Sequence, residues 1–166
     1  MVIVFTSRRD CAKEIEYSFS ATPYGECLTA WSRGWLCFAT FTPYLTREVA
    51  LHELRKTFPK ATFTTTKHTF DPTQSRPKRI LVVGTPFQCD VWRALLEVPR
   101  GKRITYSTLA SLASHPTAVR SVATSVGRNP ICVVVPCHRI VPASGGIGKY
   151  HSGEEIKRLL LASEAR

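Results

Sequence analysis

A short apolar run and the residues that follow it constrain this chain more than any other feature. The run from Ile131 to Val135 is rich in β-branched side chains, which is typical of a buried strand. Pro136 has no backbone N–H to donate, so the predicted strand ends there. Cys137 and His138 follow directly. A neighbouring base makes the nucleophilic thiolate of a cysteine accessible, so the pair predicts a reactive thiol at the end of a rigid element.

Composition and charge indicate a globular protein with an anionic partner. The chain has 166 residues and a net charge of +11, and residues 98–153 contain no Asp or Glu. This balance favours nucleic acid as the partner, the alternative being a merely soluble basic surface. No apolar stretch approaches the roughly 20 residues of a membrane span, so no membrane association is expected. The charge of Arg8 and Arg9 follows too short an apolar run for a secretory signal.

The cysteines are predicted to be reduced thiols in a cytoplasmic protein. They form no C-x-x-C pair and no Cys/His zinc spacing: Cys11, Cys27, Cys37, Cys89, Cys132 and Cys137. We therefore expect no metal and no cofactor. One alternative is a metal site built from distant ligands, such as Cys11 and Cys27 with a remote histidine. Another is that Cys137 is a buried structural cysteine beside a surface histidine, because free cysteine is among the most buried residue types.

Hydrophobic patterning predicts a β-rich first part. Strands are expected over residues 14–21, 28–31 and 35–40, the last two joined by the turn Ser32-Arg33-Gly34. A helix is expected over residues 46–58, ended by Pro59. Residues 60–78 lack a clear period and predict a linker or long loop.

The second part is predicted to be mainly helical. Thr85-Pro86-Phe87-Gln88 is a strong helix start, and Thr105 can cap a short helix that reaches Ala113. His115-Pro116 breaks the chain before helix resumes over 117–126, the outline of a helix-turn-helix. The expected fold is α+β: residues 1–78 form a small N-terminal sheet-and-helix domain with its linker, and residues 79–166 a helical C-terminal domain.

Several motifs occur in a fixed order along the second part. They are Tyr106-Ser107-Thr108-Leu109-Ala110, Ala118-Val119-Arg120-Ser121-Val122-Ala123, Asn129-Pro130, Val135-Pro136-Cys137-His138-Arg139-Ile140-Val141, Gly148-Lys149-Tyr150 and Leu160-Leu161-Ala162-Ser163-Glu164. This pattern resembles the O6-alkylguanine-DNA alkyltransferases, also called methylated-DNA–protein-cysteine methyltransferases. The close match covers about residues 83–164, half of the chain, whereas the first 80 residues fit only by length and β character.

The resemblance implies a repair reaction on double-stranded DNA. A guanine alkylated at O6, for example with a methyl group, is flipped out of the stack from the minor-groove side, and the alkyl group moves to a cysteine of the protein. The S-alkyl cysteine is a thioether that no group here is expected to cleave. The protein should therefore react once per molecule, as a monomer.

The resemblance also implies residue roles. Cys137 is the alkyl acceptor, His138 its base through a water, Glu164 the residue that orients His138, and Asn129 a brace for the turn before the predicted strand. A plain alternative makes Glu164 a solvated residue near the C-terminus. The guanine pocket is expected to involve Tyr106, Ile140, Tyr150 and His151. The expected DNA contacts are Tyr106, Ser107, His115, Ala118, Arg120 and Ser121, with Arg120 filling the gap left by the flipped base.

Two competing functions and some departures from the family pattern remain. A module that binds lesions without repair would lack the nucleophile, whereas Cys137 is present. A Cys-His hydrolase would turn over repeatedly and would not need Arg120. Ser152, Glu154 and Glu155 differ from common family residues, and the two acids are expected to affect tolerance for bulky adducts.

Overall fold

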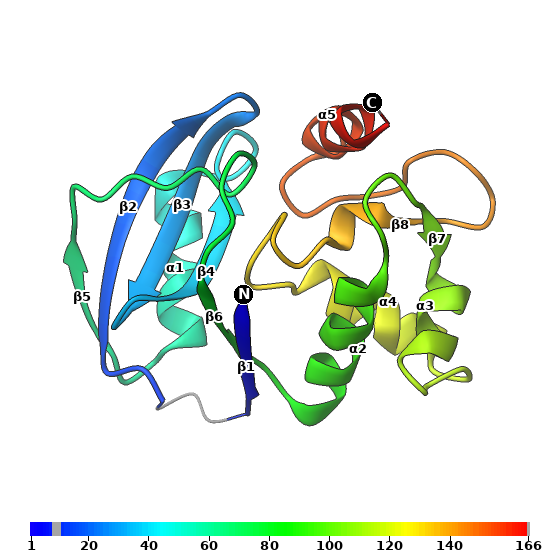
Figure 1. Cartoon of the computed structure of the whole chain (residues 1–166), viewed down its shortest axis with the longest axis horizontal. Coiled ribbons are helices and arrows are strands. Elements are labelled where there is room, and N and C mark those ends of the chain that lie inside the picture. Colours follow the sequence, from blue (N-terminus) through cyan, green and yellow to red (C-terminus); the bar gives the residue numbers. More distant parts are fainter. Residues whose placement is uncertain (8–10, 166) are drawn as a thin grey trace.

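The computed structural model describes residues 1–7 and 11–165, so Arg8 and Arg9 of the predicted N-terminal charge lie outside the described residues. A sheet-containing half lies beside a helical half (Figure 1), which confirms the predicted α+β class. The strands are β1 (Val2–Thr6), β2 (Glu14–Thr22), β3 (Gly25–Ser32), β4 (Trp35–Phe41), β5 (Thr62–Thr65), β6 (Arg79–Val83), β7 (Ile104–Thr105) and β8 (Ile140–Val141). The helices are α1 (Arg47–Thr57), α2 (Pro86–Glu97), α3 (Tyr106–Leu112), α4 (Val119–Gly127), the 3₁₀-helix η1 (Cys137–Arg139) and α5 (Glu154–Glu164). In the described part of the chain, no helix has the length and apolar character needed to cross a membrane.

The main sheet has six strands in the order β1-β6-β4-β3-β2-β5. Strands β2, β3 and β4 form the antiparallel centre, and the remaining pairings are parallel. The predicted turn between β3 and β4 is present, with positive φ at both Arg33 and Gly34, as a tight two-residue hairpin requires. Strand β6 pairs with both β1 and β4, so residues 79–83 lie in this sheet, although the predicted boundary places them with the C-terminal part.

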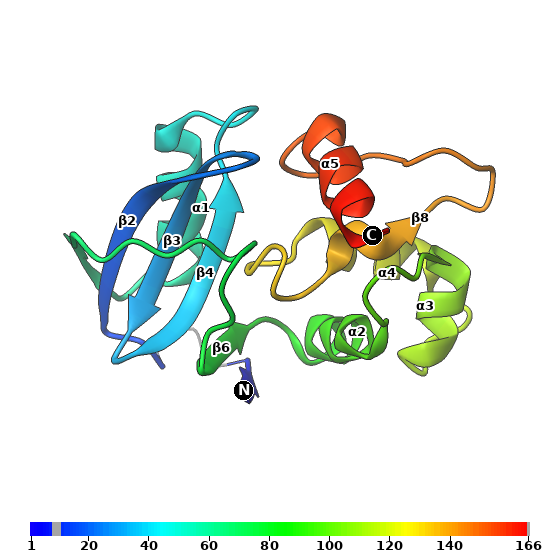
Figure 2. The ribbon, with the colours of Figure 1, turned by 45° about the horizontal axis from the view of Figure 1, so that its top comes forward.

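The two faces of the sheet are covered differently. Helix α1 is capped by Thr46, the first residue of the predicted helix, and packs its buried Ala50 and Leu54 against one face. The other face receives the extended segment 66–78, which Figure 2 shows crossing the sheet opposite α1. There Ser18 Oγ donates to the carbonyl oxygen of His68 at 2.6 Å, and the rings of Trp31 and Phe70 lie 5.1 Å apart. The segment predicted as a linker or loop therefore contains β5 and a strap across the sheet.

The helical half follows the predicted starts closely. Thr85 and Gln88 form the expected capping box of α2. Trp92 is 2% exposed and donates from its indole N–H to the carbonyl oxygen of Ser125 at 2.9 Å, which ties α2 to α4. Helices α3 and α4 form the predicted helix-turn-helix, but α4 begins at Val119, two residues later than position 117.

The strand predicted over residues 131–135 is wrong. The segment makes one isolated bridge, between Ala39 and Ile131, and Val133 has a φ of 66°. The side chain of Asn129 accepts the N–H of Ile131 at 3.0 Å and donates to the carbonyl oxygen of Val135 at 2.7 Å. Because this amide satisfies backbone groups that a strand would pair with a neighbour, β propensity is overridden and the run forms a buried turn.

Candidate active site

Cys137 is held at the start of η1, directly after the turn that Asn129 organises. The Nδ2 amide of Asn129 lies 3.0 Å from Cys137 Sγ. Cys137 is only 7% exposed and lines a cavity of about 280 Å³. The cavity walls include Tyr106 of α3, Asn129, and Tyr150 and His151 of the loop before α5. The structure thus brings the predicted acceptor and most of the predicted pocket residues together.

The thiol of Cys137 is protonated at rest. Burial raises its pKa, and the opposing effects of Asn129, Tyr150 and the charge of Lys157 do not offset that increase. The adjacent histidine predicts an accessible thiolate, but in the resting protein the loss of solvation dominates and keeps the pKa of the thiol above its usual value. A cysteine attacks as the thiolate, so a base must remove the proton before this sulfur can act as a nucleophile.

His138, the residue after Cys137 in the chain, forms a buried pair with Glu164. His138 Nε2 lies 3.0 Å from Glu164 Oε1, and the side chains are 1% and 9% exposed, respectively, which does not fit a solvated tail residue. Burial raises the pKa of Glu164, but hydrogen bonds from His138 and Arg139 lower it overall, far below its usual range. The carboxylate is therefore ionised and Nε2 of His138 carries a proton toward it.

The second ring nitrogen of His138 is free to accept a proton. Nδ1 is buried and has no hydrogen-bond partner among the described residues. Burial lowers the pKa of His138 more than the neighbouring Glu164 raises it, so the ring is neutral near pH 7. A neutral imidazole with a free lone pair on Nδ1 is equipped to accept the thiol proton.

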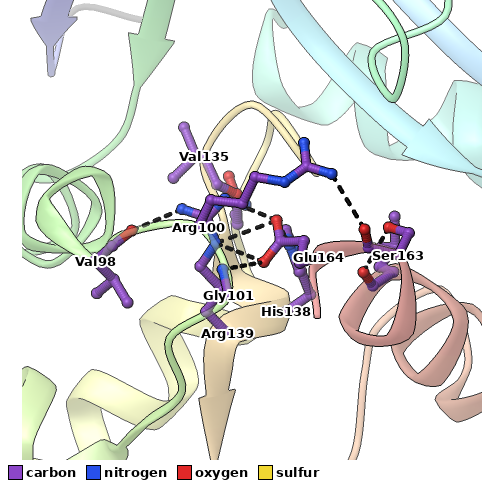
Figure 3. A network of polar contacts seen from close by, with 10 residues as sticks. Val98, Arg100, Gly101, Val135, His138, Arg139, Ser163 and Glu164 are labelled. Carbon is purple, nitrogen blue, oxygen red and sulfur yellow. Dashed lines mark hydrogen bonds and ion pairs between the residues drawn. The ribbon is translucent and has the colours of Figure 1, made fainter. Parts of the chain in front are cut away.

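Arg139 was not assigned a role from sequence, yet it anchors the pair (Figure 3). Its Nη2 donates to Glu164 Oε1 at 2.7 Å, its Nε to Oε2 at 3.0 Å, and its Nη1 to the carbonyl oxygen of Val98 at 2.6 Å. The N–H of Gly101 adds a contact to Glu164 Oε2 at 3.3 Å. Arg139 stands beside His138 in the motif, but its partner is 25 residues further on, so no local pattern could predict the pairing.

Lys157 is a second residue that sequence reasoning missed. Its side chain is almost fully buried and Nζ donates to the carbonyl oxygen of Ile140 at 2.6 Å. Burial lowers its pKa to about 8. The available signal was its position in α5, between buried Ile156 and Leu160, where an apolar residue would be expected.

Replacing Lys157 with methionine is expected to slow alkyl transfer about fivefold at pH 7, because a nearby positive charge favours the thiolate of Cys137. The difference from wild type should be largest below about pH 8 and shrink above it, because the ammonium of Lys157 in the wild type itself loses its proton there. Single-turnover rates from neutral to alkaline pH measure both effects. Arg158→Met is the matched control, because Arg158 is exposed on the same helix and pairs with Glu155. Equal profiles for wild type and Lys157→Met would contradict this role.

The other predicted residues lie in two groups. Ile140 is buried behind the pocket, where its carbonyl oxygen contacts Lys157, and it does not line the cavity. The His151 ring turns toward α1, with Nε2 at 3.0 Å from Glu53 Oε2.

The predicted DNA contacts all lie on or between α3 and α4. Ser107, Arg120 and Ser121 are exposed, and Tyr106, Ala118 and His115 are half-buried.

The side chain of His115 already has partners within the protein. Its Nε2 lies 3.2 Å from Asp90 Oδ2, and its ring packs against Phe87 with centroids 4.5 Å apart.

Within the described residues, no cluster of three or more His, Cys, Asp or Glu side chains is placed to hold a metal ion. Cys27 is fully buried in the core, while Cys11 is exposed.

Fold and site together define a class of protein: an α+β chain with a helix-turn-helix next to a buried cysteine that a His–Glu pair supports. Residues 86–166 match the family of the 6-O-methylguanine DNA methyltransferase DNA-binding domain. An inducible methylated-DNA–protein-cysteine methyltransferase of Bacillus subtilis is 45% identical over 83 residues, which are 50% of this chain and 46% of that protein. The chain spans about half the length of the curated relatives it matches.

Solved structures resemble nearly the whole chain. A variant of the Mycobacterium tuberculosis O6-methylguanine methyltransferase is 31% identical with a TM-score of 0.65, covering 91% of this chain and 93% of that one. The M. tuberculosis OGT in complex with DNA is 26% identical with a TM-score of 0.73, covering 92% of each chain. The chain belongs to the O6-methylguanine DNA methyltransferase family.

Proposed function

We propose that this protein is a methylated-DNA–[protein]-cysteine S-methyltransferase that repairs O6-alkylguanine in double-stranded DNA. The observation that carries the proposal is the Cys137 thiol on the wall of a cavity, where Asn129 contacts it. The next residue, His138, forms a buried pair with Glu164. The sulfur receives the methyl or other alkyl group, and no cofactor takes part. Residues 79–166 carry both the DNA-binding and acceptor functions, and the protein acts as a cytoplasmic monomer.

The arrangement supports a simple displacement. The proton of the Cys137 thiol passes to Nδ1 of His138, through a water in the family pattern, while the Glu164 carboxylate stabilises the imidazolium that forms. The thiolate attacks the alkyl carbon, an S–C bond forms, and the bond from carbon to O6 breaks. Its electrons stay on guanine, which takes up one ring proton, balancing the one that the thiol gave up, and leaves as the unmodified base. The product is a thioether, which cannot regenerate the thiol, so each molecule reacts once.

The helix-turn-helix suits delivery of the base. A guanine in a duplex cannot reach a buried sulfur, so it must leave the stack. Ala118 and Ser121 are small and allow α4 a close approach to a minor groove, whose pattern of donors and acceptors is degenerate in sequence. Arg120 is exposed on the same helix and is proposed to fill the gap in the stack. The M. tuberculosis OGT solved in complex with DNA supports DNA as the partner.

A duplex with a single O6-methylguanine tests the function. After incubation, mass spectrometry is expected to find one methyl group on the tryptic peptide that contains Cys137, and no more than one transfer per protein molecule. Cys137→Ser should abolish transfer and still bind the duplex, because phosphate contacts do not need the thiol. Repeated turnover would favour a hydrolase. Binding without transfer by the wild type would favour a lesion-recognition module, and label on Cys132 would refute the acceptor assignment.

A further inference from the structure

The turn between α2 and β7 packs against the C-terminal end of α5. The turn is closed by the N–H of Lys102, which donates to the carbonyl oxygen of Pro99 at 3.1 Å. From its exposed corner, Arg100 Nη2 donates to the carbonyl oxygen of Ser163 at 3.2 Å (Figure 3). The last carbonyl groups of a helix have no partner within it, so this bond supplies one from the turn. The turn and the helix end are therefore attached to each other.

Gly101 is the residue of this turn that reaches the buried carboxylate. Its N–H donates to Glu164 Oε2 at 3.3 Å. Among the described residues, the other hydrogen bonds to this carboxylate come from the side chains of His138 and Arg139. Side chains can rotate together with the carboxylate, whereas the position of a backbone N–H is set by the turn itself. Gly101 thus gives the carboxylate a fixed reference point.

The close approach of the turn to α5 depends on the absence of a side chain at Gly101. The φ angle of Gly101 is 77°, a conformation that favours glycine. A Cβ at this position would lie 3.0 Å from the backbone carbonyl oxygen of Glu164, which is closer than ordinary van der Waals contact. Any larger residue would therefore be strained and would push the end of α5 away from the turn.

We propose that Gly101 is a positioning residue for alkyl transfer, because it holds the Glu164 carboxylate where that group can orient His138. The inference rests on the proposed transfer to Cys137. Nδ1 of His138 presents a lone pair only while the ring proton stays on Nε2, which faces Glu164 Oε1 at 3.0 Å. A carboxylate that turns away from Nε2 no longer favours this tautomer. Gly101 does not line the guanine pocket, so it acts through Glu164.

A double-mutant cycle tests the positioning role. Gly101→Ala should slow single-turnover methyl transfer about tenfold, as expected when a hydrogen bond to a charged group is displaced. In a Glu164→Gln background the same change should cost less than about twofold, because the charged group that Gly101 positions is absent. Gly34→Ala is the matched control. Gly34 has a φ of 79°, but no atom lies within 4 Å of the position of its Cβ, so the strain is similar and the transfer rate should not change.

A second readout follows the His138 ring without any reaction. In the NMR spectrum of the protein without DNA, the Nε2–H proton of His138 should exchange with solvent faster in Gly101→Ala than in wild type, and at the wild-type rate in Gly34→Ala. Arg100→Met keeps the glycine and loosens the same helix end. It should slow transfer from the free O6-methylguanine base about threefold, while its exposed neighbour of equal charge, in Lys102→Met, should not.

The outcomes separate this inference from the proposed function. An equal slowing by Gly101→Ala in wild type and in the Glu164→Gln background would overturn the positioning role, as would wild-type rates and wild-type proton exchange in both Gly101→Ala and Arg100→Met. A loss that disappears in the Glu164→Gln background, together with faster exchange at His138, supports it. Failure of wild type to transfer methyl would instead overturn the proposed function, and proton exchange would still report whether Gly101 holds Glu164.

Discussion

Glu164→Gln is expected to slow alkyl transfer about a hundredfold, because the base His138 loses the carboxylate that orients its ring and balances its charge. The same change should destabilise the fold by about 3 kcal/mol, since it leaves the buried guanidinium of Arg139 without a charged partner. DNA affinity should change little, because Glu164 lies behind the pocket and outside the helix-turn-helix.

Single-turnover kinetics and denaturant unfolding measure the two effects of Glu164→Gln separately. Glu155→Gln is the matched control, because Glu155 lies on the same helix and makes an exposed pair with Arg158. The pKa of Glu164 is lowered in the folded protein, so its contribution to stability is complete above the unfolded value of about 4.3 and is lost as the pH falls toward the folded value. The stability gap between wild type and Glu164→Gln should therefore be widest near neutral pH and narrow in acid. Equal rates for both proteins would place Glu164 outside the catalytic machinery.

Arg120→Ala is expected to slow repair of duplex DNA about a hundredfold while leaving reaction with the free O6-alkylguanine base nearly unchanged. Extruding a base costs a few kcal/mol, and a side chain that fills the gap offsets part of this cost. Arg120 is exposed on α4 and does not line the pocket, so a free base that enters the pocket does not need it.

The comparison of the two substrates tests this role directly. Arg103→Ala serves as the charge control, because Arg103 is exposed in the same acid-free segment and precedes α3. Both variants should weaken DNA binding by a similar, small factor, and only Arg120→Ala should lose duplex repair. An equal loss on duplex and free base would show that Arg120 supports the structure of the pocket instead of base extrusion.

Local signals in the sequence were sufficient for the elements that local interactions determine. Thr85 and Thr105 were predicted as helix caps, and each side chain accepts the capping hydrogen bond in the structure. Thr46, at the start of the helix predicted over residues 46–58, accepts a capping hydrogen bond as well. The turn at Arg33 and Gly34 followed from residue type alone. These features depend on hydrogen bonds and backbone angles within a few residues, so a short stretch of sequence is enough to predict them.

The apolar run before the acceptor shows where local signals are insufficient. The composition of residues 131–135 favours a strand, but Asn129 and the neighbouring strand β4 supply the backbone partners of a turn. A residue's β propensity reports how well it fits a half-buried sheet surface. Here the run meets β4 at the bridge between Ala39 and Ile131, and the positive φ of Val133 then turns the chain away.

By itself, the sequence determined the α+β class, the helix-turn-helix and the adjacency of Cys137 to His138. Tertiary structure decided the electrostatics of the site. The fold buries Cys137, which raises the pKa of its thiol, and it holds Glu164 between His138 and Arg139. It also buries Lys157, whose Nζ donates a hydrogen bond to the carbonyl oxygen of Ile140. The physical reason is that solvation and charge pairing depend on groups that are distant in sequence and meet only in the folded chain, whereas caps and turns depend on neighbours along it.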